Sequence, residues 1–240
     1  MKKIWLSIIL TLSLAGTRVA LAQNLTEYDY LHNISRTGSP VWEREDIKGT
    51  PFLFEHWYPA EIITRDDRKL EVAQLNYNAK QQKFYYKQQG EYYELFPTQI
   101  RLIRVIGPEG VRTFVPTLPK PVAGKRKFAF YEIFEAPEKA YVAVAYYKKL
   151  EPADKSQSYA SDKSMRVMKY YAKKRVFVLV NGYFVKRPSS LNKLLKLLHA
   201  SDDLRRKVKQ FYRKERLSYS SPVHLQRILA YYYDQKSFTK

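Results

Sequence analysis

The stretch from Pro59 to Val105 constrains the fold most, because short β-prone runs alternate there with polar turn segments. The runs are residues 61–64, 70–77, 84–86 and 92–96. Strands this short, joined by segments this short, are typical of an antiparallel meander and not of βαβ units. In the second run, Leu70 and Val72 share a parity that Tyr77 does not, which predicts a β-bulge near Gln74–Leu75.

Tyrosine carries much of this meander, and its packing has two interpretations. A tyrosine ring covers apolar neighbours while its hydroxyl reaches water, so Tyr85 or Tyr86 can lie on either face of the sheet. One interpretation is ordinary half-burial of a residue with high β propensity. The other is an exposed aromatic platform for a sugar or a peptide, which nothing in the spacing selects.

The sheet is expected to continue on both sides of the meander. Pro51 cannot occupy a central strand, so residues 49–54 are predicted to be an edge or a lead-in, with Trp57 closing one end of the core. Later strands are expected at residues 100–106, 111–115, 128–134, 141–147, 166–171, 175–180 and 183–185, with a turn at residues 172–174. Asn181–Gly182 predicts a type I′ turn between the last two of them.

From Pro188 the apolar period changes from two to 3.6, which predicts three helices. Ser189 or Ser190 caps the first, Ser201 caps the second, and Ser221–Pro222 opens the third. The apolar faces are Leu191, Leu194, Leu195 and Leu198; Leu204, Val208 and Phe211; and Leu225, Ile228, Leu229 and Tyr232. The fold class is therefore predicted to be α+β, an antiparallel meander sheet followed by a short three-helix C-terminal tail.

Four segments organise the chain in this interpretation. Residues 1–22 are a signal peptide, 23–48 an extended arm with a short strand near Val41–Trp42, and 49–187 the antiparallel β region. A sub-boundary is expected near the proline-rich residues 116–127, and a mobile loop over the polar residues 151–164. Residues 188–240 form the basic helical tail.

The signal peptide is predicted from Lys2–Lys3, the apolar run Ile4–Leu14 and the small residues Ala20 and Ala22. We expect cleavage after Ala22, so that the mature chain starts at Gln23. Intact-mass measurement of the exported protein checks this, and a processed form that keeps residues 1–22 would contradict it. No later run approaches the roughly 20 apolar residues of a membrane span, so no transmembrane span is expected after cleavage.

The chain contains no cysteine, which excludes disulfides, thiolate metal sites and a cysteine nucleophile. An exported protein of this size without disulfides is more typical of a bacterial envelope than of a eukaryotic secretory route. The expected location is periplasmic or outer-membrane-associated in a Gram-negative bacterium.

Positive charge is concentrated at the C-terminal end. Residues 23–150 carry 19 basic and 16 acidic residues, whereas residues 151–240 carry 21 basic and 7 acidic residues. Such asymmetry suggests an acidic surface or partner. The basic residues that cluster on and just after the second helix are the candidate site: Arg205, Arg206, Lys207, Lys209, Arg213, Lys214 and Arg216.

This cluster has a plain and a functional interpretation. The plain one is a solvated face of an amphipathic helix. The functional one is contact with anionic lipid headgroups, with lipopolysaccharide phosphates or with an acidic envelope protein. Three helices with a basic middle one resemble helix-turn-helix modules superficially, but the signal peptide argues against genomic DNA as the target.

Motifs of common catalytic and cofactor sites are absent from the sequence. There is no GxSxG, Walker A loop, GxGxxG or HExxH, and His32, His56, His199 and His224 lack metal-ligand spacing. Asp66–Asp67 and Asp202–Asp203 have structural explanations in a turn and at a helix start. Neither a catalytic residue nor a metal or cofactor is therefore predicted.

The stretch Gly49–Leu53 leading to Trp57, together with the ending around Asn181–Phe184 and Leu229–Tyr232, resembles a family of exported Gram-negative envelope proteins. That resemblance would cover most of the mature chain. It implies no activity and no catalytic residues.

The expected function is that of an exported, non-enzymatic envelope protein that binds or scaffolds through its basic tail. The alternative is a hydrolase of envelope polymers, which requires carboxylates that converge in a cleft beside Glu132 or Glu135. A third possibility, nucleic-acid binding outside the cytoplasm, requires exposed aromatics beside the basic helix, such as Tyr212 and Tyr219.

Overall fold

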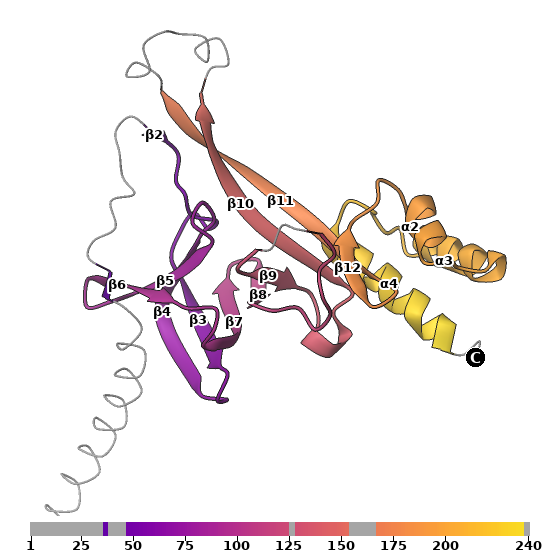
Figure 1. The fold of residues 1–240 in the computed structure, drawn as a ribbon, viewed down its shortest axis with the longest axis horizontal. Coiled ribbons are helices and arrows are strands. Elements are labelled where there is room, and N and C mark those ends of the chain that lie inside the picture. Colours follow the sequence, from indigo (N-terminus) through magenta and orange to yellow (C-terminus); the bar gives the residue numbers. More distant parts are fainter. Residues whose placement is uncertain (1–35, 38–46, 125–127, 154–166, 238–240) are drawn as a thin grey trace, which may run out of the picture.

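The structure is a computed structural model that describes residues 36–37, 47–124, 128–153 and 167–237. It is a mixed α+β fold in which a mostly antiparallel sheet is followed by three C-terminal helices (Figure 1). Within the described residues, eleven strands follow one path in the order β1-β6-β5-β4-β3-β7-β8-β9-β10-β11-β12, and β2 pairs with β11 beside that path. The predicted fold class is confirmed.

The strands range from two to thirteen residues in length. Their bounds are β1 (Arg36–Thr37), β2 (Ile47–Lys48), β3 (Tyr58–Thr64), β4 (Lys69–Asn78), β5 (Lys83–Gln88), β6 (Glu91–Leu95), β7 (Ile100–Gly107), β8 (Gly110–Val115), β9 (Tyr131–Ile133), β10 (Val142–Pro152), β11 (Met168–Val180) and β12 (Tyr183–Lys186).

Strands β3 to β6 form the predicted meander, and β7 adds to its β3 side. The β3–β4 register moves from Tyr58 opposite Leu75 to Ala60 opposite Val72, so β4 carries an extra residue at Ala73–Gln74. Leu70, Val72, Leu75 and Tyr77 are consequently all buried although their parity changes. The predicted bulge near Gln74–Leu75 is confirmed.

The strands from β7 to β9 link the meander to the C-terminal half. β7 and β8 form the predicted hairpin, and β8 also pairs with β9, which lies on the far side of residues 116–127. β9 pairs with β10 as expected, but it is shorter than predicted. A 3-10 turn (Pro137–Lys139) forms part of the connection between β9 and β10.

The longest hairpin, β10–β11, projects from the sheet (Figure 1). The sequence predicted two strands separated by a turn at residues 172–174, and this prediction is wrong. β11 is continuous, and Ala172, Lys173 and Lys174 pair with Lys148, Tyr147 and Tyr146 of β10. All three residues of the expected turn are exposed, so their polarity reflects the solvent around the projecting half of the hairpin.

The three predicted helices are confirmed as α2 (Leu191–Leu197), α3 (Asp202–Lys214) and α4 (Pro222–Ser237). Ser190 and Ser201 cap the first two, because each serine side chain accepts a hydrogen bond from a backbone N–H of the first turn. The predicted apolar faces lie inward, although Leu191 and Phe211 are only half-buried. The Asn181–Gly182 turn is also confirmed, with φ values of 49° and 84° that suit a type I′ hairpin.

Hydrophobic residues form three clusters around this framework. The first fills the meander with Tyr77, Phe84, Phe114 and Phe130 among its rings. The second joins one face of β10–β11 to the three helices, and the third covers the opposite face of the same strands. The half of the hairpin nearest the helices is therefore buried on both faces, which explains its continuous apolar run from Val176 to Val180.

The remaining predictions concern Trp57, the lead-in before the meander and segments that the structure does not describe. Trp57 does not close the core, because it is only half-buried and lies against Phe52 and Tyr92, with Lys87 Nζ 4.7 Å from its ring centroid. The lead-in is confirmed, since Phe52 makes a single bridge to Asn78. The signal peptide, the strand near Val41–Trp42 and most of the loop 151–164 lie outside the described residues.

Candidate anion-binding surface

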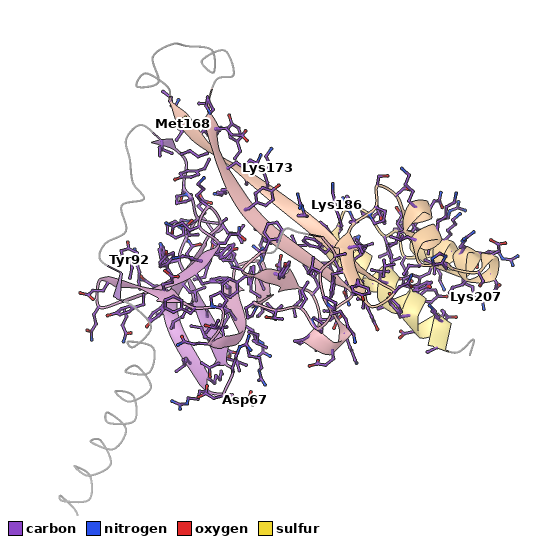
Figure 2. The ribbon with its side chains drawn as sticks, viewed as in Figure 1. Asp67, Tyr92, Met168, Lys173, Lys186 and Lys207 are labelled. Atoms are coloured by element: carbon purple, nitrogen blue, oxygen red, sulfur yellow. The ribbon has the colours of Figure 1, made fainter. Side chains whose placement is uncertain are left out.

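Helix α3 carries the predicted basic residues, and its sequence explains why they face outward. Leu204 and Val208 are buried in the cluster shared with α4, so the helical period turns the charged positions toward solvent. The seven predicted residues lie on α3 or directly after its C-terminal cap: Arg205, Arg206, Lys207, Lys209, Arg213, Lys214 and Arg216. Lys207 marks this surface in Figure 2, at the end of the molecule away from Tyr92.

The first turn of α3 supplies its own counter-charges. Asp202 pairs with Arg205 at 3.2 Å, and Asp203 pairs with Arg206 at 3.5 Å and with Lys207 at 2.9 Å. The aspartates also lie where the helix dipole favours acids, as the sequence indicated. Three of the seven predicted bases therefore have carboxylate partners. The spacing of three and four residues was the signal for these pairs, and it was overlooked.

The remaining four bases are Lys209, Arg213, Lys214 and Arg216, and none of them forms an ion pair with another described residue. All are exposed except the half-buried Lys209. The one acid among them, Glu215, pairs instead with Arg227 of α4 at 3.0 Å. These four bases thus form a cluster without acidic partners on the second half of α3 and just after its C-terminal cap.

The aromatic residues near α3 do not form an exposed platform. Tyr212 is half-buried in the helical cluster, and Phe211 stacks on Tyr231 with 4.2 Å between ring centroids. The Tyr219 hydroxyl donates to the Pro188 carbonyl, and burial raises the pKa of Tyr219 to about 12. Stacking of a single-stranded nucleic acid requires exposed aromatic faces, and neither Tyr212 nor Tyr219 is exposed.

A cleft of about 430 Å³ does lie beside Glu132 and Glu135, but the two carboxylates do not converge as a catalytic pair. Glu132 is 4% exposed, and Arg112 binds both of its oxygens, at 2.6 Å from Nε and 3.1 Å from Nη2. The Tyr146 hydroxyl donates to the same carboxylate at 2.5 Å, and its pKa is raised by burial and by the Glu132 charge. Glu135 is exposed at the rim.

The Arg112–Glu132 pair therefore has the geometry of a structural ion pair. Burial opposes the Arg112 charge, but the hydrogen bonds to Glu132 raise the pKa of the guanidinium above its ordinary value. The guanidinium also packs against the rings of Phe54, Phe114 and Tyr146, at 5.0 to 5.4 Å. Sequence reasoning missed this pair, because Glu132 meets Arg112 only through the β8–β9 register.

Three other titratable residues considered from sequence have structural partners. Asp66 accepts from Thr64 and pairs with Arg68, and Asp67 pairs with Arg101. His224 Nδ1 accepts the Ser218 N–H at 3.0 Å. In the part of the chain that the structure describes, no three acidic or histidine side chains gather closely enough to hold a metal ion.

A second basic region lies on the projecting half of β10–β11 and was not predicted. Lys149, Lys169, Lys173 and Arg175 share one face of the ribbon by strand parity, with Tyr147 opposite Lys173 and Tyr171 opposite Lys149. Figure 2 shows Lys173 midway along the hairpin and Met168 near its tip. The period-two spacing of Lys169, Lys173 and Arg175 was the available signal.

None of the helices within the described ranges combines the length and apolarity that crossing a bilayer requires. Comparison of the chain with protein-family models, curated proteins and solved structures finds no match. The fold and the surface just described are therefore the basis for assigning a function.

Proposed function

We propose that the chain is an exported, non-enzymatic envelope protein of a Gram-negative bacterium, with a binding or scaffolding role. In this proposal, the basic helical tail contacts an anionic surface, such as lipid headgroups or lipopolysaccharide phosphates. Export is supported by the signal-peptide pattern of residues 1–22, and a bacterial envelope by the absence of cysteine.

The observation that carries the proposal is a set of four bases on or just after α3 that have no carboxylate partner among the described residues: Lys209, Arg213, Lys214 and Arg216. Cations near a negatively charged leaflet contribute about 1 kcal/mol each, so four of them supply peripheral attachment of about 4 kcal/mol. The hydrolase alternative gains no support from the geometry, because Arg112 and Tyr146 already occupy the Glu132 carboxylate.

Replacing these four bases with glutamine is expected to weaken binding to anionic vesicles roughly 1,000-fold at low salt. The fold should be retained, because Leu204 and Val208 still anchor the helix. Co-sedimentation with phosphatidylcholine vesicles, with and without phosphatidylglycerol, measures the change. Binding of the unmodified protein should also fall steeply with salt, because exposed charges are screened within about 8 Å at physiological ionic strength.

The matched control removes the same charge from the sheet region, by replacing the exposed Lys48, Arg65, Lys120 and Lys139 with glutamine. This variant should bind vesicles nearly as well as the unmodified protein. If the two variants lose binding equally, net charge and not the α3 surface is responsible. If neither loses binding, the basic face only keeps the protein soluble. Circular dichroism confirms that both variants fold.

A further inference from the structure

A hollow of about 460 Å³ lies where the β4–β5 turn meets the outer edge of β10. Its lining comes from three separate parts of the chain: Lys80 and Gln82 in the turn, Phe128 before β9, and residues 147–151 of β10. A space of this size is within the range of small-ligand sites in proteins. It lies on the hairpin and shares no residue with the α3 surface.

The turn that forms one wall is held rigidly. The buried Asn78 accepts hydrogen bonds from the N–H groups of Lys80 and Gln81 through Oδ1, at 3.1 and 3.0 Å. The Lys148 N–H donates to the Ala79 carbonyl at 3.0 Å and fixes the turn to β10. These contacts fix the backbone of the turn that places Lys80 at the hollow.

Gln82 is the unusual residue of this wall. Its backbone has φ of 66°, a left-handed conformation that is unfavourable for a residue other than glycine. Its Nε2 donates to the carbonyls of Ala79 at 3.1 Å and Tyr146 at 2.8 Å, which fixes the orientation of the amide. Its Oε1 is shielded from solvent and has no donor in the described part of the chain. The Gln82 amide is therefore a fixed part of the wall, held by its two donated hydrogen bonds.

The charge of the hollow is positive. Lys80, Lys148 and Lys149 line it against one acid, Glu151. Lys148 Nζ is engaged with the Thr50 carbonyl at 2.8 Å, and burial lowers its pKa. Lys149 is 3.6 Å from Glu151, but both are about half exposed, so this pair is weak and an incoming anion can replace it. Lys80 and Lys149 are the two cations positioned for a ligand.

Phe128 and Tyr147 give the hollow an apolar strip. Their ring centroids are 5.8 Å apart and the rings are tilted by 36°. Phe128 is 7% exposed and Tyr147 is half-buried, so the strip is narrow. It suits the C–H face of a sugar ring better than a nucleobase, which stacks on an open aromatic face.

We propose that this hollow binds an acidic sugar unit, with Lys80 and Lys149 contacting the anionic group and Tyr147 covering one face of the ring. The shared chemistry is a hydroxylated ring that carries a carboxylate or a phosphate. This site goes beyond the vesicle contact of α3 and does not depend on it.

Calorimetric titration of the purified protein tests the proposal with four probes. Trigalacturonate carries carboxylates, glucose 6-phosphate carries a phosphate, maltotriose is neutral, and adenosine monophosphate carries a base. At least one acidic sugar should bind at least about 10-fold more tightly than maltotriose, because its anion makes charge-assisted contacts. Comparison of the first two probes identifies which anionic group the hollow prefers.

The double substitution Lys80→Gln and Lys149→Gln should weaken acidic-sugar binding at least about 10-fold, and Tyr147→Ala should also weaken it. The control Lys139→Gln with Lys186→Gln removes equal charge from exposed positions elsewhere and should bind normally. Absence of saturable acidic-sugar binding, equal binding by the Lys80/Lys149 variant, or tighter binding of adenosine monophosphate would overturn the proposal. Vesicle binding of the Lys80/Lys149 variant should be unchanged, so failure here is distinct from failure of the α3 assignment.

Discussion

Replacing Arg112 with methionine is expected to destabilise the protein by about 3–5 kcal/mol. The substitution removes the partner of Glu132, whose side chain is 5% exposed and has no other cation within ion-pairing distance among the described residues. Only the Tyr146 hydroxyl would still contact this carboxylate. The buried charge would then lack compensation, and its desolvation would oppose folding. Urea unfolding followed by circular dichroism measures the loss.

A triple variant separates the ion pair from the packing of the site. In Arg112→Met, Glu132→Leu and Tyr146→Phe, no polar group of the network is left without its partner. We expect this variant to regain most of the stability lost in the single variant, because a well-packed apolar replacement of a buried ion pair is often neutral or stabilising. A loss below about 1 kcal/mol in Arg112→Met alone would show that Glu132 is solvated and that the pair has little structural role.

Phe177→Ala is expected to cost about 3–5 kcal/mol, because the phenyl ring is buried and its loss leaves a cavity. Phe177 is 3% exposed, and its ring lies 6.1 Å from Phe128 and 5.8 Å from Tyr131, centroid to centroid. The substitution would open the cluster that covers one face of β10–β11, while Val178 still packs on the helices. The free energy of unfolding from denaturant melts provides the measurement.

Tyr183→Ala is the matched control for this prediction. Tyr183 lies on the neighbouring strand β12, opposite Val180, but its side chain is 54% exposed. Its removal should change the free energy of unfolding by no more than about 0.5 kcal/mol. If Phe177→Ala costs as little as Tyr183→Ala, the third hydrophobic cluster does not stabilise the sheet.

The parts of the fold that depend on neighbouring residues could be predicted from the sequence. Ser190 and Ser201 cap α2 and α3 by contacts within a few residues, and Leu194, Leu195 and Leu198 follow one helical face. The bulge of β4 was visible in the change of parity between Val72 and Tyr77. Each of these features is fixed by contacts inside one element or by the pattern of one strand.

The prediction of two strands in place of β11 was wrong because consecutive lysines usually indicate a turn. Lysines at positions 173 and 174 suggest a turn in a sheet with one buried face, but this half of the hairpin projects into solvent. Lysines also protect a strand edge from pairing with other chains, and no described strand pairs with the outer side of β11 between Lys169 and Val176. The exposure of this half of the hairpin depends on the tertiary structure, so the sequence alone could not show that the strand continues through the two lysines.

The candidate sites also differ in whether their residues are neighbours in the sequence or only in the folded chain. The seven bases near α3 were found because they are clustered in the sequence, yet three of them pair with Asp202 or Asp203, and four have no carboxylate partner among the described residues. The hollow could not be found, because the Gln82 side chain meets the Tyr146 carbonyl across 64 positions of the chain. Arg112 and Glu132 are 20 positions apart and meet through the pairing of β8 with β9.

The contact between the β4–β5 turn and β10 has a consequence for the order of folding. The first hydrophobic cluster is built mostly from residues 54–114, but Phe130 is buried in it and Tyr146 packs against it. The Ala79 carbonyl likewise accepts from the Lys148 N–H, a donor that belongs to β10. When only the meander has been synthesised, its hydrophobic core thus still lacks the contacts of Phe130 and Tyr146. We expect the N-terminal half to mature only after the hairpin has docked, so the two ends of the chain acquire their native structure in one cooperative step.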